Sequence, residues 1–365
     1  MRESPVVVIY PGTAGARPWR RASRRADWNS LGHVEKEHMQ QRTLAGLGEV
    51  SALTLGGGGL GQVWGPTSRV EAVATVLEAV AGGINLLDLA PGYGRGEAEA
   101  VVGEAFGGRL PTGVRVTTKC QLGSPPVEQV EAIVRRRLER SLEGLRTDRV
   151  DLLLLHSNLI PDDYVYPRDS ATQDRFATRL SLFDDAVVPV FEALHEEGLI
   201  GAWGITGVGL PATVIEVLGS ARPPAVVQVV ANCLDSPGDM RRYDEPARPR
   251  DIIKAAVAAG VGVMGIRAVQ AGALTDGFDR DIPAESLDVR DFERAAPFRA
   301  LAAELGMTPA LLAHRYALGI DGVATVVLGV KNRSELAECL AAEKAGPLDA
   351  AMQRRIDDTV GRRAK

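Results

Sequence analysis

The sequence predicts an α/β fold built on a parallel sheet, and two features of its pattern indicate this. Apolar runs of strand length alternate with longer segments whose apolar residues recur at helical spacing. The runs at residues 84–87 and 151–155 are apolar along most of their length, as expected for strands that helices cover on both faces. Such alternation favours a parallel sheet with right-handed crossovers. A chain of 365 residues is long enough to form one α/β barrel.

The first half of the chain shows the alternation clearly. Residues 41–61 are expected to form a short hairpin and then the first barrel strand, which ends in the glycine run 56–59. Such glycines permit close approach of the backbone to a ligand or form a flexible loop, and both interpretations stay open. Further strands are expected at 84–87, 114–118 and 151–155, and helices at 68–81, 95–106 and 127–144.

The second half resumes the pattern after a long polar segment, residues 157–183. Expected strands lie at 202–206, 226–230, 261–266 and 323–328, which completes a set of eight. Helices are expected at 295–305, 309–318 and 336–345, followed by a tail helix within 349–363 that packs outside the barrel. Pro309 stands where proline suits the start of a helix.

Composition limits the classes of protein to which the chain can belong. The hydrophobic fraction is 45%, the mean hydropathy is −0.02, and no apolar run is long enough to span a bilayer. The net charge of −5 gives no indication of a nucleic-acid surface. Cys120, Cys233 and Cys339 lie far apart without metal-ligand spacing, which predicts free thiols, no bound metal and a cytoplasmic location.

Residues 1–39 do not follow the barrel pattern. Their one apolar run, residues 6–10, is too short for the core of a signal peptide. We expect a disordered leader or a start codon assigned too early, because Met39 stands just before the patterned sequence begins. The expected domains are therefore a leader at 1–39 and a barrel at 40–365.

Three successive strands end in ionisable residues of different types. Asp88, Lys119 and His156 end the second, third and fourth expected strands, and Tyr93 lies in the turn after Asp88. One such residue is usually structural. Four complementary types at one rim indicate catalysis, because the C-terminal ends of the strands form the working face of a parallel barrel.

These residues carry a family resemblance. Asp88-x-Ala90-x-x-Tyr93-Gly94, then Lys119 and His156, resembles the catalytic tetrad of the aldo-keto reductases, and the resemblance runs from about residue 41 to about residue 345. It implies an NADPH-dependent (β/α)8 TIM barrel, with an N-terminal hairpin and a C-terminal tail helix, that reduces an aldehyde or ketone to an alcohol. Tyr93 would donate the proton, with its pKa lowered by Lys119. Asp88 would hold Lys119, and His156 would orient the carbonyl.

The resemblance also implies contacts to the cofactor. Around the nicotinamide the sequence matches the family pattern only in part, because Thr206 stands where the family has serine and Arg267 replaces another serine. Lys331 and Arg333 would hold a 2′-phosphate beside a helix N-terminus, although an ordinary solvated basic turn is the alternative. The expected cofactor-binding residues are Gly57, Thr206, Gln228, Arg267, Gly329, Lys331, Asn332, Arg333, Glu335 and Glu338.

The polar segment 157–183 leaves the barrel directly after His156. It is expected either to form a lid over the site or to be a disordered insertion. As a lid, it would supply Tyr164 and Tyr166 as walls of the substrate pocket. Trp64 would form the facing wall, or would be a plain packing residue.

Other functions remain open at this point. Family members also reduce sugar nucleotides or carbonyls of secondary metabolites, and the potassium-channel β-subunits share this fold and tetrad as redox-sensing accessory subunits. The expected partner is a small carbonyl compound, with no nucleic acid and no membrane. The sequence leaves the oligomeric state open.

Overall fold

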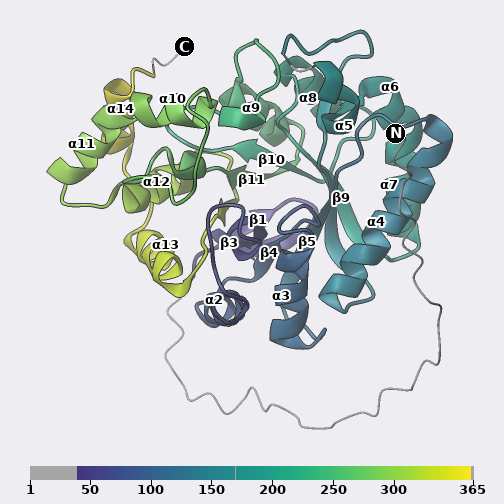
Figure 1. Ribbon diagram of the computed structural model, residues 1–365, viewed down its shortest axis with the longest axis horizontal. Helices are drawn as coiled ribbons and strands as arrows, with labels where there is room; N and C mark the ends of the chain where they lie inside the picture. Colours follow the sequence, from purple (N-terminus) through teal and green to yellow (C-terminus); the bar gives the residue numbers. More distant parts are fainter. Residues whose placement is uncertain (1–38, 169, 363–365) are drawn as a thin grey trace, which may run out of the picture. The chain divides into compact units, whose positions relative to one another are not determined.

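The structure of the chain, a computed structural model, describes residues 39–168 and 170–362. The expectation for the leader therefore lies outside the described residues, apart from Met39. In the described part of the chain, eight parallel strands close into a barrel, as the sequence predicts (Figure 1). In order around the barrel they are β3 (Leu53–Gly56), β4 (Leu86–Asp88), β5 (Arg115–Cys120), β6 (Val150–Leu155), β9 (Ile200–Thr206), β10 (Val226–Val230), β11 (Gly262–Ile266) and β12 (Thr325–Leu328).

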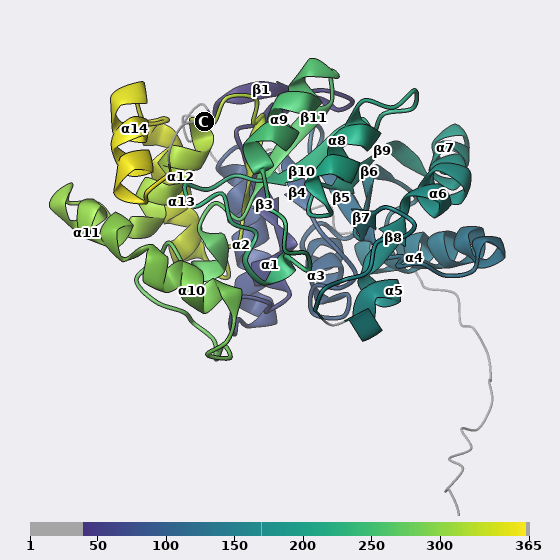
Figure 2. The same cartoon turned by 90° about the horizontal axis from the view of Figure 1, so that it is seen from above.

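Helices cover the outside of the barrel and follow most of its strands (Figures 1 and 2). The longer ones are α2 (Arg69–Ala81), α3 (Glu97–Phe106), α4 (Val130–Leu145), α7 (Val188–Glu196), α8 (Pro211–Leu218), α9 (Pro249–Ala258), α10 (Leu287–Arg294), α11 (Ala296–Glu304), α12 (Pro309–Leu318), α13 (Arg333–Ala345) and α14 (Ala350–Thr359). Short turns of helix are α1 (Gly57–Leu60), α5 (Gln173–Phe176) and α6 (Leu180–Leu182).

The expected N-terminal hairpin closes one end of the barrel. Strands β1 (Gln41–Leu44) and β2 (Gly48–Ser51) pair antiparallel. A Cβ added to Gly262, the first residue of β11, would lie 2.7 Å from Leu44 Cδ1, so the hairpin lies against the end where the strands begin. Figure 2 shows β1 at one end of the barrel and α1, α5 and α10 at the other. The barrel strands end at this second end, and it is there that the sequence places the candidate site.

The core has an inner and an outer layer. Side chains from alternate strand positions fill the barrel with a small apolar cluster that includes Leu86, Leu152 and Met264. The intervening residues, such as Leu87 and Leu153, face outward and pack in a larger cluster with the helices. This alternation explains why the strands are apolar on both faces. It also fixes which residues farther along each strand point into the barrel.

Several details differ from the sequence pattern. The first long helix after β4 begins at Glu97 rather than Arg95, because Arg95 and Gly96 have φ values of 57° and 94°, which a right-handed helix excludes. The glycine run after β3 forms α1 instead of an open loop. A Cβ on Gly59 would lie 1.9 Å from Val330 O, so this glycine permits close approach of the chain's own backbone after β12.

The described part of segment 157–183 is folded, so the alternative of a disordered insertion does not hold there. Strands β7 (Asn158–Ile160) and β8 (Ala177–Arg179) pair in parallel as a separate two-stranded sheet. A small apolar cluster packs at this sheet and contains Ile160, Tyr166, Ala177, Leu210 and Tyr243.

Two expectations from composition can be compared with the described residues. Cys120, Cys233 and Cys339 are buried and form no disulfide. Among the helices described, none combines the length and the hydropathy that a membrane crossing requires.

Candidate active site

A layer of polar side chains lies inside the barrel, next to the apolar interior and toward the C-terminal ends of the strands. Its members are Asp88, Thr117, Lys119 and Gln228, and each is at most 2% exposed. Asp88 follows the interior Leu86 by two residues, and therefore points to the same side of its strand. Thr117 stands opposite Asp88 in the register of β4 and β5, and Lys119 is one pleat farther along β5.

Asp88 and Lys119 form a buried ion pair. Lys119 Nζ lies 2.8 Å from Asp88 Oδ2 and donates a second hydrogen bond to the Leu89 carbonyl, also at 2.8 Å. Asp88 Oδ1 accepts from Thr117 Oγ1 at 2.7 Å and from Gln228 Nε2 at 2.8 Å. A buried ion pair requires such additional hydrogen bonds to offset the loss of hydration. This layer therefore holds a fixed cation at the end of β5.

The structure brings the other two predicted catalytic residues to this cation. Lys119 Nζ lies 4.8 Å from the centre of the Tyr93 ring. The Tyr93 and His156 rings meet edge to face, with centroids 6.0 Å apart and an interplanar angle of 86°. A Cβ on Gly57 would lie 3.3 Å from Tyr93 Cδ2, so the backbone of α1 also packs against the Tyr93 ring. All four residues of the expected tetrad thus share one site.

Burial sets the protonation states at this site. It raises the pKa of Tyr93 above its ordinary value of 10.0, and the opposing effect of the Lys119 ammonium is smaller. Lys119 thus lowers the pKa of Tyr93, as expected, but desolvation outweighs the cation and the net shift is upward. Burial also acts to lower the pKa of Lys119, but the Asp88 carboxylate and Tyr93 together reverse this, and the pKa is raised.

His156 is neutral at physiological pH. Burial, followed by the nearby Lys119 ammonium, lowers its pKa from the ordinary 6.5 to about 3. Its backbone N–H donates to the Cys120 carbonyl at 2.8 Å, which anchors the residue just after β6. A neutral imidazole can orient a carbonyl oxygen by hydrogen bonding. The protonated phenol of Tyr93 is then the group that has a proton to give.

Two residues expected near the nicotinamide, Gln228 and Thr206, have different partners: Gln228 bonds Asp88 of the tetrad, and Thr206 bonds a backbone carbonyl of the barrel. Because an ionised carboxylate only accepts, the bond from Gln228 Nε2 to Asp88 orients the amide, with Oε1 as the group left to accept from a ligand. The Thr206 hydroxyl, buried, donates to the Leu155 carbonyl at 3.1 Å. The Gln228 amide oxygen can therefore accept a hydrogen bond from a ligand that carries an amide. The Thr206 hydroxyl is instead used in a hydrogen bond between two barrel strands.

Arg267 lies in a buried polar network just beyond β11. Its guanidinium is paired with Asp288 of α10, and its Nε donates to Gln270 Oε1 at 2.9 Å. Gln270 in turn donates to Asp291 at 2.6 Å. Burial lowers the pKa of Arg267, against the effect of Asp288. Arg267 thus links the strand end to α10, and its charge is matched within the protein.

The basic residues after β12 also have carboxylate partners. Lys331 Nζ contacts Asp279 at 2.6 Å and is paired with Glu335 as well. Arg333 makes two hydrogen bonds of 3.1 Å to the Glu71 carboxylate. A phosphate that bound here would compete with these carboxylates, a feature that the basic sequence pattern alone did not reveal.

Helix α13 begins here with a capped N-terminus. The Asn332 side chain accepts from the Glu335 N–H at 2.9 Å, which gives α13 an N-cap. Glu338, one turn on, accepts from the Thr308 hydroxyl.

A Cβ on Gly329 would lie 3.2 Å from Trp64 Nε1, so this glycine accommodates the indole.

The residues expected to line a substrate pocket pack against other parts of the chain. Trp64 stacks with the Arg280 guanidinium, whose carbon lies 5.1 Å from the ring centre. Tyr164 and Tyr166 contact each other edge to face, and Tyr164 Oη lies 3.0 Å from Glu245. Tyr166 belongs to the apolar cluster at β7 and β8, and Tyr164 packs against that cluster. Trp64 packs elsewhere, against Arg280. These contacts favour a packing role for all three side chains.

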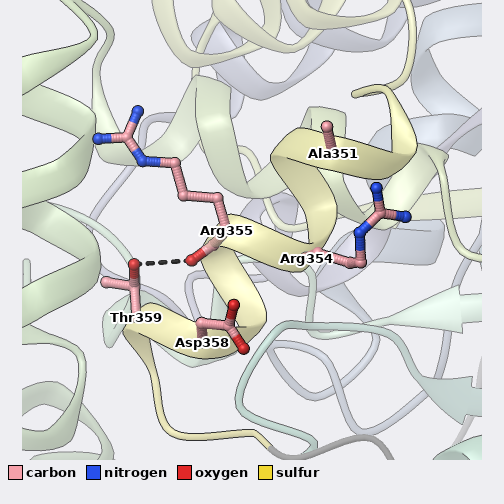
Figure 3. A pocket seen from close by; sticks show the side chains of 5 residues that line it. All are labelled: Ala351, Arg354, Arg355, Asp358 and Thr359. Carbon is pink, nitrogen blue, oxygen red and sulfur yellow. Dashed lines mark hydrogen bonds between the residues drawn. The ribbon is translucent and has the colours of Figure 1, made fainter.

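Two surface hollows of the described residues lie away from the tetrad. Figure 3 shows one on α14, where it is lined by Ala351, Arg354, Arg355, Asp358 and Thr359. A second lies around the first hairpin strand and the turn after α12, with Arg42 and Gly319 in its wall. Neither contains a residue of the tetrad. The site is therefore identified by its side-chain geometry rather than by a cavity.

The buried hydrogen bonds of Thr117, Thr118 and Glu99 were not predicted from the sequence. Thr117 hydrogen-bonds Asp88, and Glu99 of α3, which is 2% exposed, accepts from Thr118 Oγ1 at 2.6 Å. Both threonines lie in the β-branched run of β5, where threonine is common for reasons of strand propensity. For Thr117 the spacing relative to Lys119 was the available signal, since a residue two positions before Lys119 shares its face.

Comparison with known proteins agrees with the barrel fold. The Aldo/keto reductase family model matches residues 52–360. L-galactose dehydrogenase of Arabidopsis thaliana is 27% identical over 308 residues, which cover 83% of this chain and 88% of that protein. The aldo-keto reductase AKR11C1 from Bacillus halodurans, in its holo form, aligns with a TM-score of 0.64 and 23% identity over 90% of this chain and 98% of that one. An aldo-keto reductase from Klebsiella pneumoniae in complex with NADPH aligns with a TM-score of 0.62 and 21% identity over 90% and 97% of the two chains. The chain belongs to the aldo/keto reductase family and is an NAD(P)H-dependent oxidoreductase.

Proposed function

We propose that the protein reduces an aldehyde or ketone to an alcohol, with NADPH as hydride donor and Tyr93 as proton donor. The observation that carries this proposal is the position of Tyr93, with Lys119 Nζ 4.8 Å from its ring centre and the His156 ring 6.0 Å away. Carbonyl reduction needs a proton donor beside a group that stabilises the resulting anion. A buried ammonium next to a phenol meets both requirements.

Each residue of the tetrad has its own role in the proposed reduction. The nicotinamide, when bound, supplies the hydride to the carbonyl carbon. His156, neutral because its pKa is lowered to about 3, donates a hydrogen bond to the carbonyl oxygen and orients it. Tyr93 gives its proton to that oxygen as negative charge develops there. Lys119 stabilises the phenolate that remains, while Asp88 keeps the ammonium in place.

The residues present fit the nicotinamide part of the cofactor. The Gln228 amide is oriented by Asp88 so that Oε1 can accept from a carboxamide N–H. At the other end, Lys331 and Arg333 would hold a 2′-phosphate only by exchanging carboxylate partners, namely Asp279 and Glu335 for Lys331 and Glu71 for Arg333. We therefore expect a preference for NADPH over NADH that is modest and depends on these ion pairs.

A second candidate is oxidation of a sugar by the same site. The observation that favours it is the match to L-galactose dehydrogenase, which extends over 88% of that protein. In this direction Tyr93 would act as the base that accepts the hydroxyl proton, and its support by Lys119 would be needed at the start of the reaction. Because burial raises the pKa of Tyr93, oxidation would need a higher pH than reduction.

One assay separates the two. The purified chain is given NADPH or NADH with 4-nitrobenzaldehyde, methylglyoxal and D-glyceraldehyde, and separately NADP⁺ or NAD⁺ with L-galactose, at neutral and alkaline pH, while absorbance of the reduced cofactor is followed. Carbonyl-dependent loss of NADPH supports the first proposal. Turnover confined to the sugar arms supports the second. Tight cofactor binding without turnover in any arm would contradict both and would favour a redox-sensing subunit.

A further inference from the structure

Asp88 receives two hydrogen bonds that do not come from the ion pair itself. Thr117 Oγ1 lies 2.7 Å and Gln228 Nε2 lies 2.8 Å from Oδ1, while Lys119 binds Oδ2. The two oxygens of the carboxylate are thus assigned to different partners. Neutral donors from β5 and β10 occupy one oxygen, and the cation occupies the other.

The placement of Thr117 follows from strand register. In the parallel pairing of β4 and β5, Asp88 stands opposite Thr117, so their side chains leave the sheet on the same face. Lys119 is two residues farther along β5 and shares that face. Strand β5 therefore contributes both a neutral donor, Thr117, and a cation, Lys119, to the carboxylate of Asp88. Thr118, between them, points to the opposite face and bonds Glu99 of α3 instead.

We propose that Thr117 is a positioning residue that fixes the plane of the Asp88 carboxylate and thereby holds the Lys119 ammonium against Tyr93. This inference rests on the proposed function of the tetrad. A carboxylate anchored at Oδ1 by two donors cannot rotate about its last bond without breaking both bonds. With Oδ2 fixed, Lys119 keeps the position from which its charge counters the effect of burial on the pKa of Tyr93. Hydrogen bonds to a buried charged group are also the stronger ones.

The chain offers two matched variants for the test. Thr117→Val keeps the size and shape of the side chain and removes only the hydroxyl that bonds Asp88. Thr118→Val makes the same change one residue later, also in the fully buried part of β5, but on the face that bonds Glu99. A structural loss common to both variants would appear in each. A loss that acts through Asp88 would appear in the first alone. Thr117→Ser restores the hydroxyl and is the rescue variant.

Two readouts are compared across these variants. The first is kcat and KM for 4-nitrobenzaldehyde with NADPH. We expect Thr117→Val to lower kcat about tenfold with little change in KM, as loss of one hydrogen bond to a charged group implies. Thr118→Val should leave kcat near the wild-type value, although it lowers the melting temperature, and Thr117→Ser should recover most of the rate.

The second readout needs no turnover. The ionisation of Tyr93 is isolated as the difference in tyrosinate absorbance between each protein and the same protein carrying Tyr93→Phe, with circular dichroism used to confirm folding at each pH. We expect Thr117→Val to move the Tyr93 midpoint upward by roughly one pH unit, because the displaced ammonium supports the phenolate less. Thr118→Val should leave it in place.

The outcomes separate this inference from the proposed function. If the wild type turns over no carbonyl, the proposed function fails, and the Tyr93 titration still decides the role of Thr117. An unchanged Tyr93 midpoint in Thr117→Val, or an equal shift in Thr118→Val, would overturn the inference even in an active enzyme. Should Thr117→Val fail to fold, Thr117→Ala is titrated in its place with the same expectation.

Discussion

The Lys119 ammonium lies 4.8 Å from the centre of the Tyr93 ring, and its only carboxylate partner among the described residues is Asp88 at 2.8 Å. The three groups are linked in series, because Asp88 fixes the cation and the cation acts on the phenol. Burial opposes ionisation of Tyr93 more strongly than Lys119 favours it. The resting site thus keeps the phenol protonated, with a cation in place to stabilise it once the proton has left.

The first prediction concerns the stability of the ion pair. Lys119→Met should lower the free energy of unfolding by roughly 3–5 kcal/mol, because it leaves the Asp88 carboxylate buried without a cation. Asp88→Asn combined with Lys119→Met should recover part of that loss. Urea unfolding, followed by circular dichroism, measures both. If the single and double variants lose equal stability, the charge of Asp88 is not the cause.

The second prediction concerns pH. The folded chain holds His156 neutral down to about pH 3, whereas the unfolded chain takes up a proton below its ordinary pKa of 6.5. The stability that this neutral residue provides is therefore complete above pH 6.5 and is lost as the pH falls from 6.5 toward 3, by roughly 2–4 kcal/mol. His156→Asn should flatten this part of the stability curve. His195→Asn, at an exposed position of α7, is the control variant.

The third prediction concerns cofactor choice. Replacing Lys331 and Arg333 together with alanine should weaken NADPH binding about tenfold more than NADH binding, since charge-assisted contacts to phosphate would be lost. Glu71→Gln should have the opposite effect, because it releases Arg333 from its carboxylate partner. Fluorescence titration gives both dissociation constants, with Arg135→Ala on α4 as the control. Equal affinity of the wild type for the two cofactors would contradict the assignment.

The fourth prediction concerns the start of the barrel. Met39 is 6% exposed, and a Cβ on Gly83 would lie 2.8 Å from its Cβ, so this residue belongs to the packed core. A chain that begins at Met39 should melt within about 3 °C of the full chain, because the sequence pattern of the barrel begins only after this residue. A chain that begins at Arg42 should melt lower, because it lacks Met39. Differential scanning calorimetry tests this, and a large loss in the Met39 chain would show that earlier residues pack on the barrel.

The sequence predicted the fold and the tetrad because both depend on local patterns. Asp88, Lys119 and His156 each end an apolar run, and parallel strands bring such ends to one rim. The role of Thr117 was not predictable in this way, because it depends on the register between β4 and β5.

Other features depend on contacts between residues far apart in sequence. Lys331 reads as a free basic residue until the fold brings Asp279 to it, 52 residues away. The strands of segment 157–183 contain only three residues each, too few to show a period. Helix α10 was missed because its sequence is mostly polar, and its buried Asp288 and Asp291 face the network around Arg267.

The most direct test of the whole account is the turnover of Tyr93→Phe. This change removes one hydroxyl and leaves the Asp88–Lys119 pair and the His156 ring in place. We predict that kcat for carbonyl reduction falls about 100-fold or more, as loss of a general acid implies, while the dissociation constant for NADPH stays close to the wild-type value. An unchanged kcat would contradict the account, because the proton would then come from another group.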